Sequence, residues 1–157
     1  MDFLVHILIY NLAASILLYG SLAVNPRIWL HRMPPEVRSK VAEKSPAEQK
    51  LFIKFAIPFV LLLFGYPCVY AFYEGTFYWN DLWILLAFFA SFALWDTLVL
   101  DILIFCKLTP RFVIITGTRR EDYLNMKYHL VSGAKGLVMS ILFSGVLAGI
   151  LYILKSI

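Results

Sequence analysis

Two carboxylates, Asp96 and Asp101, lie within an otherwise apolar stretch of the chain, residues 82–106. A stretch of this length can cross the hydrocarbon core of a membrane, where an ionisable side chain is costly and usually marks a functional or tightly paired site. Counted from residue 82 at about 1.5 Å per residue, Asp96 lies roughly 21 Å along the crossing and Asp101 roughly 28 Å along it. Asp96 is therefore the deeper carboxylate, whereas Asp101 is close enough to the boundary to be solvated.

The spacing of these carboxylates argues against a simple pair, because five residues correspond to roughly 140° around an α-helix. Without local distortion they would face different ways, so Asp96 needs its own donor. The sequence offers four at a suitable depth, with Lys135 the preferred partner: Tyr19, Ser140, Lys54 and Lys135. Two interpretations stay open. Asp96 either binds a proton or cation during transport, or forms half of a buried polar pair that fixes helix packing.

A second group of candidate residues lies in two basic loops that each begin with a Pro-Arg step. Arginine binds phosphate through two parallel hydrogen bonds, and basic residues beside membrane helices bind anionic lipid headgroups. Ordinary anchoring of the loops is the alternative explanation of the same charges. The residues expected to converge on a headgroup are Arg27, His31, Arg111, His129 and Lys135.

Other chemistry has little support in the sequence. The histidines show neither HxxH nor HExxH spacing, and there is no glycine-rich phosphate loop or nucleophile elbow. We therefore predict no metal and no cofactor, and no catalytic residue can be assigned. Cys68 and Cys106 would lie near opposite membrane faces, so a disulfide between them is not expected.

The elements that must position these residues are membrane helices. Hydrophobic residues make up 61% of the chain and mean hydropathy is +0.78, which is far from the composition of soluble domains. We predict an all-α integral membrane protein, a single domain of four transmembrane helices whose first helix is retained rather than cleaved. The expected crossings are 3–24, 52–73, 82–106 and 134–154.

Basic residues predict the orientation, because Lys and Arg near helix ends are retained on the cytoplasmic side. They flank the first and third connections, whereas the 74–81 connection has none and is rich in Tyr and Trp. Both termini are therefore expected outside a cell (inner) membrane, with two cytoplasmic loops that contain short interfacial segments. The net charge of +4 is then explained by the membrane topology. The expected partners of the basic loops are membrane lipids, and nucleic acid is not expected.

Local patterns refine this picture. Ser45 and Glu48 form a capping box that predicts a helix from Pro46, and Pro58 and Pro67 predict kinks in that helix. Residues 112–116 resemble a short strand that lies on the membrane or packs under the bundle. Residues 121–131 suggest a short interfacial helix before the fourth crossing.

Two further patterns concern repetition and assembly. The segments 25–30 and 109–114 share a polar-Pro-Arg-apolar pattern, which fits either a duplicated hairpin (1–73 and 82–157) or shared interface chemistry. Gly145 and Gly149 form a small-residue pair that lets another backbone approach closely. Packing within the protomer and contact with a second copy in a homo-oligomer fit this pair equally well.

Taken together, these observations favour a small multi-pass protein that binds an anionic lipid or amphiphile at its cytoplasmic rim, with transport or presentation of that ligand as the role that binding would serve. The alternatives are an ion- or proton-coupled carrier or channel component centred on Asp96, a structural subunit, and a lipid-modifying enzyme.

Overall fold

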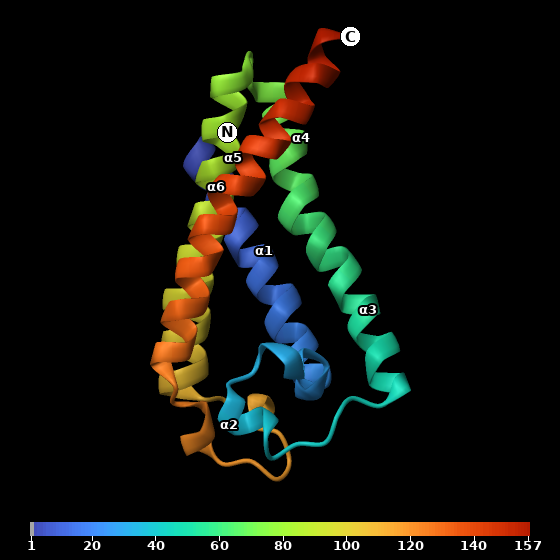
Figure 1. Cartoon of the computed structure of the whole chain (residues 1–157), viewed down its shortest axis with the longest axis vertical. Coiled ribbons are helices and arrows are strands. Elements are labelled where there is room, and N and C mark those ends of the chain that lie inside the picture. Colours follow the sequence, from blue (N-terminus) through green and yellow to red (C-terminus); the bar gives the residue numbers. More distant parts are fainter. Residues whose placement is uncertain (1) are drawn as a thin grey trace.

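The computed structural model describes residues 2–157, which are almost entirely helical (Figure 1). Within these residues there is no β-strand. The expected all-α chain is confirmed, because each predicted crossing falls inside a helical stretch that is long and apolar enough to cross a membrane. These stretches are Phe3–Val24, Pro46–Glu74, Tyr78–Leu108 and Arg120–Ser156.

The second and third stretches are not continuous α-helices. Each contains a π-helical segment, in which the backbone hydrogen bonds run from residue i to i+5. The second stretch also contains Pro58, in its first α-helical part, and Pro67, just after its π-helical segment, which are the two prolines expected to distort this crossing. The elements are α1 (Phe3–Val24), α3 (Pro46–Val60), η2 (Leu61–Gly65), α4 (Tyr66–Glu74), α5 (Tyr78–Trp95), η3 (Asp96–Leu108) and α6 (Met126–Ser156).

Both chain ends lie toward one end of the bundle, and the two long loops with α2 (Pro35–Arg38) lie at the other, which we call the loop end (Figure 1). The largest helix interface is between α5 and α6. In Figure 1, α4 lies close to α6 at the upper end, whereas α3 diverges from α6 toward the loop end, with α1 between them. The helix ribbons are therefore farthest apart near the loop end.

The helix starts follow from capping. Ser45 accepts a hydrogen bond from the backbone N–H of Glu48, and the Glu48 carboxylate accepts one from the N–H of Ser45, so the predicted capping box and helix start are confirmed. At α6, the Asn125 side chain accepts a hydrogen bond from the N–H of Tyr128 over 2.9 Å. The expected separate helix at 121–131 is wrong, because this cap starts the fourth crossing at Met126.

The loops share a hydrophobic core of their own. Residues 112–116 pack at the loop end of the bundle without forming a strand: Val113 and Ile115 are buried, and the N–H of Ile115 donates to the Tyr123 hydroxyl over 2.9 Å. Short 3-10 turns contribute further buried residues to this core. They are η1 (Pro26–Arg32), η4 (Arg111–Val113) and η5 (Arg120–Tyr123).

Polar contacts also join the two loops. Lys40 forms an ion pair with Asp122 over 2.6 Å, and the Asn125 side-chain amide donates to Glu36 over 2.8 Å. Because these contacts link residues far apart in the sequence, they hold the end of the first loop against the start of α6.

Candidate functional site

Two adjoining cavities lie between the helices near the loop end. The histidine cavity, of about 210 Å³, is lined by residues of α1, α3, η1, η2, α5, η3 and α6 that include His31 and His129. The phenylalanine cavity, of about 430 Å³, is lined mainly by α5, η3, η2 and α6. Its phenylalanines are Phe64, Phe89, Phe92 and Phe143. Arg32 and Asp96 line both cavities.

The π-helical segment η3 brings Asp96 and Asp101 to one cavity. In this segment the N–H of Thr109 donates to the carbonyl of Ile104, five residues earlier, over 2.8 Å. Residues five apart then lie nearly above one another, so both carboxylates line the histidine cavity. The expectation that they face different ways held only without local distortion, and the π-helical register of η3 is such a distortion.

Asp101 is already paired. The Nδ1 of His129 lies 2.9 Å from its Oδ2, and the His129 side chain is only 4% exposed. The other ring nitrogen of His129, Nε2, is buried and has no hydrogen-bond partner among residues 2–157. Because an ionised carboxylate can only accept hydrogen bonds, Nδ1 of His129 is the donor in this contact.

Asp96 has no hydrogen-bond or ion-pair partner within the part of the chain that the structure describes. Lys135 lines the phenylalanine cavity with it, but they form no ion pair, so the preferred pairing is not observed. Tyr19 donates instead to the carbonyl of Leu100 over 2.7 Å, and Ser140 donates to that of Gly136 over 2.9 Å. The Asp96 carboxylate is left without a protein partner in the walls of both cavities.

Arg32 belongs to the same basic rim as Arg27 and His31, but it was not among the residues expected to bind a headgroup. It ends η1, and its backbone carbonyl accepts a hydrogen bond from the Tyr128 hydroxyl over 3.3 Å. This contact with α6 places its side chain along both cavities. Among residues 2–157 its guanidinium makes no hydrogen bond or ion pair with protein. In the sequence it is one of many basic loop residues, and its place in the walls of both cavities is what distinguishes it.

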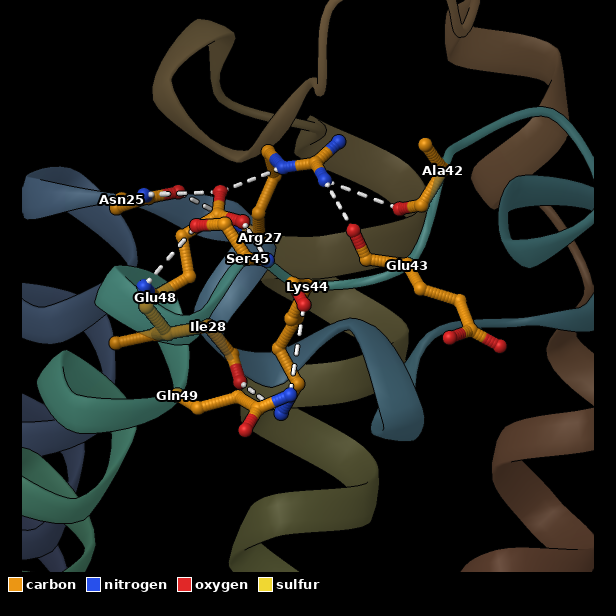
Figure 2. A network of polar contacts seen from close by, with 9 residues as sticks. All are labelled: Asn25, Arg27, Ile28, Ala42, Glu43, Lys44, Ser45, Glu48 and Gln49. Atoms are coloured by element: carbon orange, nitrogen blue, oxygen red, sulfur yellow. Dashed lines mark hydrogen bonds and ion pairs between the residues drawn. The ribbon is translucent and has the colours of Figure 1, made fainter.

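Arg27 is committed to holding the first loop together (Figure 2). Its Nε donates to Glu48 over 2.6 Å, and its terminal nitrogen donates to the carbonyls of Ala42 and Glu43 over 3.0 and 3.1 Å. Arg111 is exposed in η4 and lines neither cavity. The two Pro-Arg corners therefore do not meet at one site, although each starts a 3-10 turn. The duplication suggested by this likeness stays a prediction.

His31 lies on the loop side of the histidine cavity, and its ring packs edge-on against Phe52 at a centroid distance of 5.2 Å. Partial burial lowers the pKa of His31 below its ordinary value, and the nearby charges of Lys44 and Arg32 lower it further. His31 is therefore a neutral member of the site at pH 7.

The site cannot be interpreted through relatives. The chain matches no protein-family model, no curated protein and no solved structure. Within residues 2–157, no three His, Cys, Asp or Glu side chains gather closely enough to hold a metal ion. What remains is a pair of cavities with apolar walls, an unpaired arginine, an unpaired aspartate and a lysine.

Proposed function

We propose that this protein is a multi-pass protein of the cell membrane that binds an anionic amphiphile from the cytoplasmic leaflet. One observation carries the proposal: the unpaired guanidinium of Arg32 and the side chain of Lys135 line the same apolar cavity. In this arrangement, cations bind the headgroup and the apolar walls bind the chain.

The headgroup part rests on Arg32 and Lys135. A guanidinium binds phosphate or carboxylate through two parallel hydrogen bonds, and an ammonium adds a second positive charge. Neither cation is neutralised by a protein carboxylate among the described residues. Basic pockets of this kind between membrane helices bind anionic headgroups.

The chain part rests on the walls of the phenylalanine cavity. Beside the four phenylalanines, Leu63 and Met139 contribute apolar surface, and the cavity volume of about 430 Å³ lies within the usual range for small-molecule sites. The ring of Phe64 packs against that of Phe143 at a centroid distance of 5.2 Å. An alkyl chain can therefore extend from the cations along α6 toward this pair of rings.

The orientation rests on the charge of the loops, since both basic loops lie at the loop end and basic loops are retained in the cytoplasm. Single cysteines at positions 2 and 157, in a background with Cys68 and Cys106 replaced by Ala, should react with an impermeant thiol reagent outside intact cells. A cysteine at position 42, in the first loop, should react only after permeabilisation. An unreactive position 157 in intact cells would contradict this orientation.

The binding test uses the detergent-solubilised full chain and a monoacyl phosphate amphiphile, lysophosphatidic acid, with monoacylglycerol of the same chain length as the uncharged comparison. We expect Arg32→Gln to weaken binding of the phosphate amphiphile about 10- to 100-fold, the value of a charge-assisted hydrogen bond, and to leave monoacylglycerol binding nearly unchanged.

Arg111→Gln is the matched control, because Arg111 is an exposed loop arginine outside both cavities. It should leave both affinities unchanged. Equal affinities of wild type and Arg32→Gln for the phosphate amphiphile would refute the proposed site.

A further inference from the structure

The two unpaired charges that line both cavities have opposite signs. Asp96 and Arg32 each contribute to the walls of the histidine cavity and of the phenylalanine cavity. They form no ion pair with one another within 4.0 Å. Asp96 is half-buried and Arg32 is solvent-exposed, so the site has one anionic and one cationic position that a ligand can neutralise.

The charges around Asp96 restrict what that ligand can be. Asp101 contacts His129, so the charged residues that line the cavities without a protein partner are Asp96 from η3, Arg32 from η1 and Lys135 from α6. A ligand with only negative charge would be repelled by Asp96. A simple cation would be repelled by Arg32 and Lys135. A ligand with both charges satisfies both positions.

Aromatic rings give an independent indication at the same place. The histidine cavity, which Asp96 lines, is also lined by Tyr19, Trp29, Phe59 and Phe92. The faces of such rings attract cations, most strongly where water is excluded. A carboxylate among aromatic rings is therefore a suitable environment for an ammonium group.

We propose that the amphiphile has a zwitterionic headgroup, whose phosphate or carboxylate binds Arg32 and whose primary ammonium binds Asp96 beside the aromatic rings. The inference rests on the proposed function and keeps its anionic group at Arg32, but it changes the ligand from an anionic amphiphile to a zwitterionic one with a headgroup of the phosphoethanolamine type. In this arrangement the ammonium lies in the histidine cavity and the alkyl chain in the phenylalanine cavity, with the anion between them at Arg32.

The experiment compares lysophosphatidylethanolamine with lysophosphatidic acid of the same chain length, both titrated against the detergent-solubilised full chain at pH 7. We expect the wild type to bind the ethanolamine amphiphile at least tenfold more tightly, because only this ligand neutralises Asp96. Asp96→Asn should abolish the preference, by weakening the ethanolamine amphiphile about tenfold while phosphate binding stays equal or improves. Arg32→Gln should weaken both ligands.

Asp122→Asn is the control for a lost carboxylate, because Asp122 lies outside both cavities, and it should leave both affinities unchanged. The wild-type comparison needs no variant, so equal affinities for the two amphiphiles overturn the inference even where Asp96→Asn does not fold. Equal weakening of both ligands by Asp96→Asn also overturns it. If Arg32→Gln weakens binding but the wild type does not prefer the ethanolamine amphiphile, only this inference fails. If Arg32→Gln binds the phosphate amphiphile as tightly as the wild type does, the proposed function itself is refuted.

Discussion

Asp101 and His129 connect the π-helical segment η3 to the start of α6, with 2.9 Å between the carboxylate Oδ2 and the imidazole Nδ1. This contact fixes the wall of the histidine cavity that both side chains line. Asp101→Leu leaves the buried Nδ1–H without an acceptor and should lower the free energy of unfolding by about 1–3 kcal/mol. Asp101→Asn retains an oxygen acceptor and should lower it much less. Thermal unfolding in detergent measures both, and equal losses would show that the hydrogen bond is not what Asp101 contributes.

At the opposite end of the bundle, Lys155 of α6 is held by Asp81 of α5. Its Nζ lies 2.7 Å from Asp81 Oδ1 and also donates to the carbonyls of Ala71 and Gly75 over 2.9 and 3.0 Å. Because Asp81 is fully buried, Lys155→Met leaves an uncompensated charge and should cost about 3–5 kcal/mol of stability. The double variant Asp81→Asn with Lys155→Met should recover part of that loss, as measured by the same unfolding assay. Additive losses in the double variant would contradict a direct pair.

Gly75 is required by the same ion pair, whereas Gly145 is not required within the protomer. A Cβ at Gly75 would lie 1.7 Å from Asp81 Oδ1 and 2.6 Å from the carbonyl oxygen of Ala71, but a Cβ at Gly145 or Gly149 would meet nothing within 4 Å. Gly75→Ala should therefore destabilise the chain. Gly145→Ala should leave the monomer unchanged or stabilise it by up to about 1 kcal/mol through helix propensity.

The oligomeric state of Gly145→Ala in detergent tests whether Gly145 contacts a second copy of the chain. The Gly145 face is open in the protomer, so a change from oligomer to monomer in Gly145→Ala, seen by light scattering, would support contact with a second copy. An unchanged particle size would show that this face does not hold copies together.

His31 predicts a pH dependence of stability. Burial and the charges of Lys44 and Arg32 lower its pKa in the folded protein, so below the ordinary pKa of about 6.5 the unfolded chain binds a proton more readily than the folded chain. The stability that neutral His31 contributes is complete above that pKa and is lost as the pH falls through it. His31→Gln should flatten the fall in melting temperature between pH 7.5 and 5.5. An identical pH profile for the variant would exclude His31 as its source.

The sequence alone predicted the four long apolar helices. Hydrophobic length is a local property, so the four stretches could be found without knowledge of their contacts, and the helix from residue 82 onward is long and apolar enough to cross a membrane despite its two carboxylates. The start of α3 could be predicted from local sequence as well, because Ser45 and Glu48 each accept a hydrogen bond from the other's backbone N–H within one turn. Asp96 was selected as a candidate only from its depth along the third crossing and from the free-energy cost of an ionisable side chain at that depth.

The tertiary structure decided which polar residues share a site. The π-helical register of η3 brings Asp101 to the cavity of Asp96, and residue composition does not reveal a change from i+4 to i+5 hydrogen bonding. Arg27 and Arg32 are the same residue type in the same loop, but Arg27 is bound by Glu48 while Arg32 is left open. Pairing of this kind depends on distances between segments far apart in the chain, so it exists only after the helices and loops have packed.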